Sequence, residues 1–400
     1  MTSGSEMKVI PPGLRNGLPI KVWASQVEDS CIDQAVNLAN LPFAIGHIAL
    51  MPDAHPGYGM PIGGVLFADD AIVPYAVGVD IGCGVSLQST GMVDLEGKLQ
   101  TVLDRIAARV PVGNGPGAQH EIGLEPALNW KTILAEVPDI SRFSSTALDA
   151  VSKAETQLGT LGGGNHFIEI QQDEYGEVFV MLHSGSRSVG KKICDHWHKI
   201  ALGLNQRWHS ALPDKELAYL PWGSEEARGY FHDMRLAMLW AEQNRGRMRD
   251  AVSSVFIEEF GVEPTLITDI HHNYAAWENH RGRNGIVHRK GAVRSREGEV
   301  VLIPGSMGTA SYVGEGLGNP ESFMSCQHGA GRARSRSATT KLESEEHFKE
   351  SMSGILMGGK AAAARDESPF AYKDIETVMA DSADLVRPVQ RLTPMGVVKG

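Results

Sequence analysis

The chain has 400 residues, of which 42% are hydrophobic and 21% charged, as expected of a globular protein with a sizeable core. Its formal net charge of −11 argues against a general nucleic-acid binder, because phosphate contacts need clustered Lys and Arg, but it allows a local basic groove. No run of about 18 apolar residues or secretion signal is present, so we expect a cytoplasmic protein without membrane contact. The four scattered cysteines predict reduced thiols rather than a disulfide scaffold.

Helices and short strands are predicted along the whole chain. Apolar residues at helical spacing indicate helices, and short apolar runs bounded by glycine or proline indicate strands. The expected helices cover residues 30–41, 96–110, 145–158, 189–208, 344–357 and 374–386, and the expected strands cover 47–51, 166–171 and 178–184. A Ser-Glu-Glu cap opens residues 224–261, which we expect to form one long helix or two stacked ones, in a peripheral insertion without chemistry of its own.

The domain organisation follows from the spread of the unusual segments. The chain has no internal repeat, low-complexity tract or Pro/Ser-rich linker. Candidate functional residues run from residue 53 to residue 399. A site assembled from the whole length predicts a single domain, 1–400, with 224–261 as a helical insertion within it.

Several residues beside glycines could ligate a metal ion. They are Asp80 and Cys83 in VGVDIGCG, His166 after LGGGN, His183 in MLHSGSR, and the pair His271 and His272 in HHNY. If the strands at 166–171 and 178–184 pair as a hairpin, His166 and His183 lie close together. This mixed oxygen, sulfur and nitrogen set suits Mn²⁺, Zn²⁺, Co²⁺ or Fe²⁺ better than Mg²⁺ or Ca²⁺. A single histidine on a strand is more often structural, so both interpretations stay open.

Asp53 and His55 follow a predicted strand and precede a glycine-rich loop, in MPDAHPGYG. They could hydrogen-bond metal ligands and orient them. They could equally cap a tight turn, and the residues alone do not separate these two roles.

Two glycine-rich segments, GTLGGGNHF and PGSMGTASY, are typical of anion-binding loops, although such loops are often only turns. Neither matches a P-loop, and no Rossmann motif occurs in a clear strand–turn–helix setting. Arginines near these segments, among them Arg187, Arg289 and Arg332, suit bidentate phosphate contacts, with solvated surface charge as the alternative. A neutral His328, in QHGAGR, could attack phosphorus and form a phosphoramidate. The residues alone do not single it out from the other histidines.

Nine segments resemble, in the same order, the signature segments of the RtcB family of RNA-splicing ligases: MPDAHPGYGMPIGG, VGVDIGCG, LGTLGGGNHFIEI, HSGSR, HHNY, HRKGA, PGSMGTASY, HGAGR and the terminal VVKG. They span residues 51–400. The resemblance implies an α+β fold, a single large domain with mixed, largely antiparallel sheets around a metal-lined cleft and with peripheral helices. It also implies a GTP- and Mn²⁺-dependent enzyme that joins RNA 2′,3′-cyclic phosphate or 3′-phosphate ends to 5′-hydroxyl ends. The intermediates would be a histidine–GMP adduct and an activated RNA-3′-ppG end.

The resemblance further implies roles for individual residues. Two Mn²⁺ ions would be held by Asp80, Cys83, His166, His183 and His272, with Cys83 as the bridging thiolate and His272 preferred over His271. His328 would carry GMP, and Asp53 would be the essential acidic residue near the metals. GTP would contact Asn165, Glu169, Ser306, Ser311, Tyr372 and Lys399. RNA phosphates would contact Arg187, with Arg289 and Arg332 as further phosphate candidates.

Two other function classes compete with an RNA ligase. A metal-dependent phosphoesterase acting on cyclic-phosphate RNA ends would need the metal ligands but not His328. A non-catalytic RNA-binding protein is the third class, and the acidic net charge and the complete set of site residues argue against it. The sequence names neither the RNA nor an activating protein partner, and a monomer is the default expectation.

Overall fold

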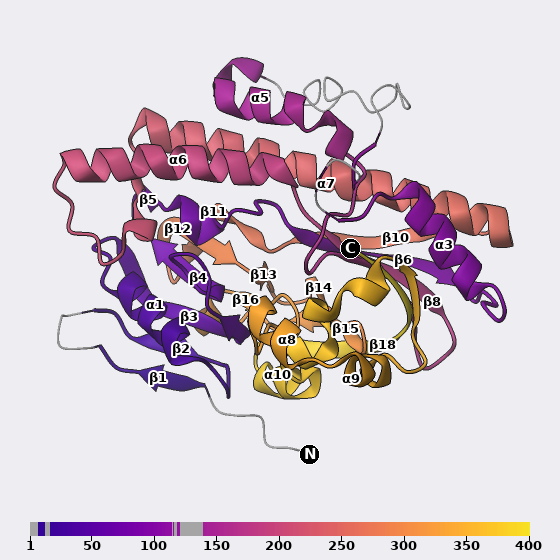
Figure 1. Cartoon of the computed structure of the whole chain (residues 1–400). Helices are drawn as coiled ribbons and strands as arrows, with labels where there is room; N and C mark the ends of the chain where they lie inside the picture. The colour runs from indigo at the N-terminus through magenta and orange to yellow at the C-terminus, as the bar shows by residue number, and fades with distance from the viewer. Residues whose placement is uncertain (1–6, 13–16, 114, 116–117, 121–138) are drawn as a thin grey trace.

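The computed structural model describes residues 7–12, 17–113, 115, 118–120 and 139–400, and two large β-sheets form its centre (Figure 1). The first sheet has the order β1 (Lys8–Ile10), β2 (Ile20–Val22), β3 (Ala44–His55), β4 (Ile62–Ala68), β12 (Arg283–Lys290) and β11 (Asn273–His280). The second has the order β10 (Thr265–His271), β6 (Gly84–Gly91), β8 (Val178–Ser184), β7 (Phe167–Gln172), β18 (Val386–Lys399), β15 (Ser311–Gly316) and β14 (Val300–Ile303), with β17 (Leu356–Gly359) also on β18.

Strand pairing in these sheets is mixed but mostly antiparallel, as expected. The parallel pairs among the named strands are β2 with β3 and β17 with β18. Two short antiparallel pairs complete the strands: β13 (Ala292–Arg294) with β16 (Ser325–Gln327), and β5 (Ala71–Ile72) with β9 (Leu220–Pro221). The two strands expected at 166–171 and 178–184 do pair as a hairpin, because β7 and β8 are antiparallel and Phe167 pairs with His183.

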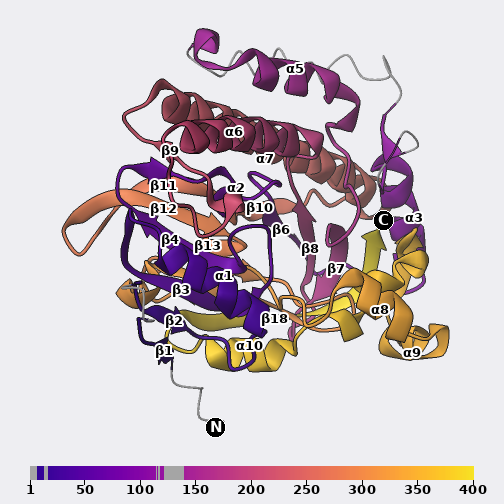
Figure 2. The same ribbon diagram turned by 60° about the vertical axis from the view of Figure 1, so that its left-hand side comes forward.

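Helices cover the sheets. They are α1 (Asp29–Ala39), α2 (Pro74–Val77), α3 (Leu99–Arg109), α5 (Ser145–Lys153), α6 (Ser188–Arg207), α7 (Glu225–Phe260), α8 (Arg336–Leu342), α9 (Glu345–Ser351) and α10 (Ile375–Asp381). Both views show α6 and α7 side by side above the strands, with α5 on their outer side (Figures 1 and 2). Among the described residues, none of the helices has the length and apolarity needed to cross a bilayer.

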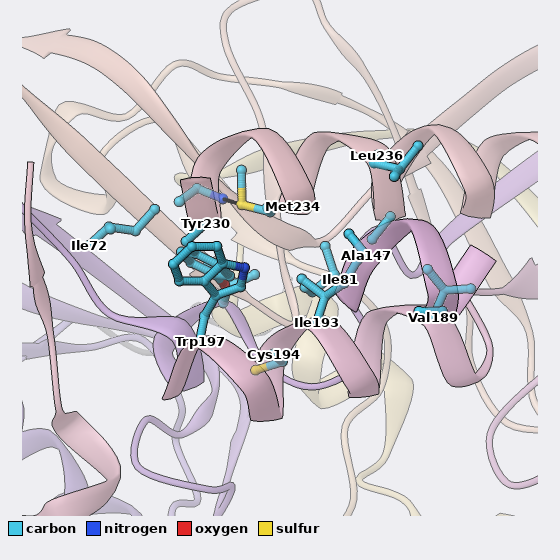
Figure 3. Packing of buried hydrophobic residues seen from close by; sticks show 14 of the residues in the cluster. Ile72, Ile81, Ala147, Val189, Ile193, Cys194, Trp197, Tyr230, Met234 and Leu236 are labelled. Carbon is cyan, nitrogen blue, oxygen red and sulfur yellow. Dashed lines mark hydrogen bonds between the residues drawn. The ribbon is translucent and has the colours of Figure 1, made fainter. Parts of the chain in front are cut away.

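The segment expected to form one long helix or two stacked ones forms one continuous helix, α7, from Glu225 to Phe260. Its first turn is capped by Ser224, whose hydroxyl accepts from the Ala227 amide, and its C-terminus is closed by Gly261 in the left-handed conformation. Trp197 of α6 packs against Tyr230 of α7 in a large apolar cluster (Figure 3). Such burial makes α7 part of the core rather than a peripheral segment.

Two helix predictions near the C-terminus were too long. The helix expected at 344–357 ends at Ser351, because Gly354 adopts a positive φ of 81° and the chain then forms β17. The helix expected at 374–386 ends at Asp381, and a turn buries Leu385 before β18 begins. The shorter helices leave residues free to form β17 and β18. These two strands pair in parallel, with Gly359 opposite Lys399.

Candidate metal centre and nucleotide pocket

The five predicted metal ligands meet where neighbouring strands of the second sheet end. Asp80 and Cys83 lie on the loop before β6, His166 precedes β7, His183 lies in β8, and His272 connects β10 to β11. Because β10, β6, β8 and β7 are consecutive in the sheet, these positions converge. The loop turns at Gly82, where φ is +73° and an added Cβ would lie 2.7 Å from the α7 backbone.

The donor atoms form two groups that share Cys83. One group contains Asp80, Cys83 and His166, and the other contains Cys83, His183 and His272. The Cys83 Sγ lies 3.5 Å from Nε2 of His166 and 3.2 Å from Nε2 of His183. Nε2 of His166 lies 3.1 Å from Oδ2 of Asp80, and the Nε2 atoms of His183 and His272 are 3.4 Å apart. The structure thus brings together all five residues in an arrangement with one shared sulfur.

Backbone carbonyls orient two of the imidazoles. Nδ1 of His166 lies 2.9 Å from the Leu161 carbonyl, and Nδ1 of His183 lies 3.1 Å from the Asn165 carbonyl. A proton on each Nδ1 makes these hydrogen bonds and leaves Nε2 free to bind a cation. Burial lowers the pKa of His183 well below its ordinary value, so this ring is neutral at pH 7.

The two anionic candidates differ in how their charge is stabilised. Burial alone would raise the pKa of Asp80, but its hydrogen bond to His166 and the charge of that ring lower it to about 2. Burial raises the pKa of the Cys83 thiol well above its ordinary value. The thiolate is therefore stable only beside additional positive charge, which a divalent cation would provide.

Arg245 of α7 supports the loops that carry the candidate metal ligands. Its buried guanidinium donates to the carbonyls of Gly82 (2.9 Å) and Ser184 (3.1 Å) and to Asp269 (2.7 Å). The adjacent Asn244 makes similar hydrogen bonds to the backbone of Gly159, Thr160 and Gly185. The expectation that this segment is peripheral is thereby corrected, since the helix holds the positions next to Cys83 and His183.

His328 follows β16 and lies beside the candidate metal ligands. Its Nδ1 is 2.6 Å from Oδ2 of Asp53, and its backbone amide donates to the same oxygen. The Asp53 side chain is fully buried, and the rings of His328 and His272 are centred 4.7 Å apart. Asp53 thus contacts His328, and His55 contacts the Asp53 backbone carbonyl. A proton on Nδ1 leaves Nε2 of His328 as an unprotonated nucleophile.

A cavity of about 220 Å³ opens beside His328. It is lined by every residue predicted to contact GTP, namely Asn165, Glu169, Ser306, Ser311, Tyr372 and Lys399. Burial raises the pKa of Glu169 to about 8, although its hydrogen bond to Gln171 and the charge of Lys399 oppose this shift. We call this cavity the inner pocket.

Glu367 is a buried residue of the inner pocket that sequence reasoning missed. Its carboxylate is 3.0 Å from Arg332, 2.8 Å from Arg336 and 3.9 Å from Lys399, and it also accepts from the Tyr372 hydroxyl. Burial would raise its pKa, but these cations lower it. The only signal in the sequence is an acidic residue five positions before Tyr372, which gave no reason to select it.

A second cavity, of about 1050 Å³, adjoins the inner pocket, and we call it the outer cleft. The candidate metal ligands Asp80, Cys83 and His272 line it, and so does His328. Its other lining residues include Tyr58, Tyr75, Lys290, Arg332, Arg334 and Arg336. Four cationic side chains, Lys290, Arg332, Arg334 and Arg336, therefore line this cleft, although the chain as a whole is acidic.

The three arginines predicted to contact RNA phosphates have different surroundings. Arg332 lines both cavities. Arg187 is half-buried and donates to the Thr160 hydroxyl at 3.3 Å. The prediction for Arg289 was wrong, because its side chain is 0% exposed and its guanidinium is bound by Glu278 and by the Phe323 carbonyl.

Comparison with known proteins identifies the family. A family model described as tRNA-splicing ligase RtcB matches residues 34–400. The RNA-splicing ligase RtcB of Escherichia coli K12 is 39% identical over 398 residues, which cover 96% of this chain and 97% of that protein. The tRNA-splicing ligase RtcB of Thermococcus kodakarensis is 34% identical over 441 residues, which cover 93% of this chain and 92% of that protein. The RNA-splicing ligase RtcB of Mycobacterium tuberculosis is 35% identical over 436 residues, which cover 92% of this chain and 100% of that protein. The chain belongs to the RtcB family and is a ligase.

Proposed function

We propose that this enzyme joins RNA 3′-phosphate or 2′,3′-cyclic phosphate ends to 5′-hydroxyl ends, using GTP and a GMP adduct on His328. One observation carries the proposal. His328 lines both the inner pocket and the outer cleft, and its Nδ1 is fixed by the buried carboxylate of Asp53. A nucleophile at this junction can receive a nucleotide from one side and pass it to RNA on the other.

The donor set fits two divalent cations of intermediate softness, such as Mn²⁺. Three imidazoles, a carboxylate and a shared thiol converge within one centre, and hard cations such as Mg²⁺ seldom select sulfur ligands. Asp80, Cys83 and His166 would hold one ion, and Cys83, His183 and His272 the other. When bound, these cations would neutralise charge on the phosphoryl oxygens.

The proposed reaction has three steps, preceded for cyclic ends by hydrolytic opening to the 3′-phosphate. First, Nε2 of His328 attacks the α-phosphorus of GTP, the N–P bond forms, and pyrophosphate leaves with the electron pair of the broken P–O bond. Asp53 stabilises the positive charge that develops on the imidazole. Second, an oxygen of the RNA 3′-phosphate attacks the same phosphorus, and the N–P bond breaks to restore His328. Third, the 5′-hydroxyl oxygen attacks the RNA 3′-phosphorus, loses its proton, and displaces GMP.

The inner pocket supplies groups that suit a guanine nucleotide. An ionised Glu169 can accept from the N1–H and the 2-amino group of guanine, and Lys399 lies on the adjacent strand. Ser306 and Ser311 add hydroxyl groups to the same cavity. Adenine lacks this pair of donors, so the pocket favours GTP over ATP.

A joining assay tests the proposal against the phosphoesterase alternative. One RNA with a 2′,3′-cyclic phosphate end and one with a 5′-hydroxyl end are incubated with GTP, Mn²⁺ and enzyme. We expect joined RNA with the wild type and with His347→Ala, a control at an exposed histidine, and no joined RNA with His328→Ala. If the wild type opens the cyclic phosphate but never joins the ends, the phosphoesterase is correct and the ligase mechanism is wrong.

A further inference from the structure

Tyr58 is an exposed aromatic side chain on a tightly held loop of the outer cleft. Its side chain is 65% exposed and lines the same cavity as His328. Its backbone is fixed, because its carbonyl accepts from the buried Nζ of Lys290 and the next amide, of Gly59, donates to the carboxylate of Glu216. Gly59 has a positive φ of 67° and an added Cβ would lie 3.0 Å from the Glu216 backbone, so glycine suits this turn. The ring of Tyr58 is therefore exposed to solvent on a loop whose backbone is held in place by hydrogen bonds.

A stacked pair of rings, Tyr75 and His198, lies beside Tyr58. The rings of Tyr58 and Tyr75 are centred 6.5 Å apart, and Tyr75 is stacked on His198 at 3.9 Å. The Tyr75 hydroxyl donates to Asp195 at 3.2 Å. Lys290 also donates to the Tyr75 carbonyl at 3.2 Å, so one buried ammonium group ties the backbones of both tyrosines.

Cationic side chains line the same cavity. Arg336 is 54% exposed, and Arg334 lies over the Phe370 ring at 3.8 Å while donating to the Phe370 carbonyl. Arginines supply contacts for a phosphate backbone, and exposed aromatic rings supply stacking surfaces for unpaired bases. A cleft with both features, and with the candidate nucleophile in its wall, matches a single-stranded nucleic-acid end better than a duplex or a free nucleotide.

We propose that Tyr58 stacks against an unpaired base of the RNA whose end reacts in the outer cleft. This inference rests on the proposed function, because the RNA is its substrate. Stacking on a tyrosine ring is tolerant of base identity, so the contact would select a single-stranded end without reading its sequence. Tyr58 would then act in RNA binding, separately from the transfer of GMP to His328.

Anisotropy of a labelled single-stranded RNA with a 3′-phosphate measures this contact. We expect Tyr58→Ala to raise the Kd about 5- to 100-fold, in line with the usual contribution of one stacked base. Tyr58→Trp retains a stacking surface and should bind within about twofold of the wild type. Tyr175→Ala is the matched control, because Tyr175 is 76% exposed on the β7–β8 turn and does not line the cleft. We expect its Kd to be unchanged.

RNAs with a single abasic nucleotide, placed in turn at each position near the reacting end, identify the stacked base. At one position, we expect the abasic RNA to bind the wild type as weakly as intact RNA binds Tyr58→Ala, and the variant to lose nothing more. The proposal is overturned if Tyr58→Ala binds intact RNA as tightly as the wild type does, or if its loss is the same for every abasic RNA. It is also overturned if Tyr58→Trp binds as weakly as Tyr58→Ala while retaining the melting temperature of the wild type.

A separate measurement without RNA distinguishes this proposal from the proposed function. The wild type is incubated with GTP labelled at the α-phosphate and Mn²⁺. A wild type that takes up no label but binds RNA through Tyr58 contradicts the ligase mechanism alone. A wild type that forms the adduct but binds RNA independently of Tyr58 contradicts the stacking proposal alone.

Discussion

Replacing Glu169 with Gln tests how the inner pocket recognises guanine. Glu169 is 3% exposed, and burial raises the pKa of its carboxyl group from 4.5 to about 8. Two groups oppose this shift only in part: Gln171, on the same strand, donates a hydrogen bond, and Lys399, on the neighbouring strand β18, contributes positive charge. Without a bound nucleotide, the protonated form of Glu169 therefore outnumbers the ionised form about tenfold at pH 7.

Guanine binding should consequently depend on pH. Only the ionised carboxylate can accept from both guanine donors, so below about pH 8 binding must release a proton. This release costs about 1.4 kcal/mol per pH unit, which is a tenfold change in affinity. We expect the Kd for guanosine to fall about tenfold for each unit between pH 6 and pH 8 and to level off above that. Glu169→Gln cannot titrate, and it should bind guanosine weakly with no pH dependence from this group.

Isothermal titration calorimetry with guanosine, without phosphate or metal, isolates this effect. Titrations in two buffers with different ionisation enthalpies count the released protons, and we expect close to one at pH 7 for the wild type. A wild-type Kd that does not change between pH 6 and pH 8 would refute the reasoning. So would an equal slope in Glu169→Gln, because the titrating group would then lie elsewhere.

Three further predictions follow from buried charges. Asp53→Asn keeps the shape of the side chain but removes its charge, so adduct formation with labelled GTP should slow by about 10³-fold or more, with unchanged Mn²⁺ binding measured by electron paramagnetic resonance. Arg245→Met leaves Asp269 and two loop carbonyls without this donor, which should lower the free energy of unfolding by about 3–5 kcal/mol and weaken Mn²⁺ binding. Arg249→Met, whose native side chain shares Asp269 but not these carbonyls, should leave Mn²⁺ binding unaltered. Finally, the pKa of Glu169 is higher in the folded than in the unfolded chain, so its contribution to stability is full below about pH 4.5 and is lost as pH rises to about 8. In urea unfolding, the free energy of unfolding of Glu169→Gln should therefore rise relative to that of the wild type across this range, by at most about 5 kcal/mol.

The sequence predicted the parts of the fold and site that depend on local pattern. The strands at 166–171 and 178–184 were predicted because they are short apolar runs, and the structure shows that they pair as a hairpin. The convergence of the candidate metal ligands was stated from the resemblance to a family, since periodicity does not give strand order. The structure adds the reason, which is that their strands are consecutive in one sheet.

Features that depend on burial could not be read from residue types. Arg289 and Glu278 lie on adjacent strands, β12 and β11, and form a buried ion pair that looks in the sequence like two solvated charges. Glu367 was missed for the same reason, since its partners come from distant segments and from the last strand. The role of α7 in supporting the loops of the candidate metal site could not be predicted either, because Arg245 donates to backbone carbonyls, which leave no signal in the sequence.

Transfer of GMP to His328 is the central claim and can be measured directly. The purified enzyme is incubated with GTP labelled at the α-phosphate and Mn²⁺, digested, and analysed by mass spectrometry beside His328→Ala and the surface control His347→Ala. We predict one GMP on His328 in the wild type and in His347→Ala, and none in His328→Ala. A label on another residue, or none with Mn²⁺, Co²⁺ or Zn²⁺ in a folded, metal-binding enzyme, would contradict the proposed mechanism.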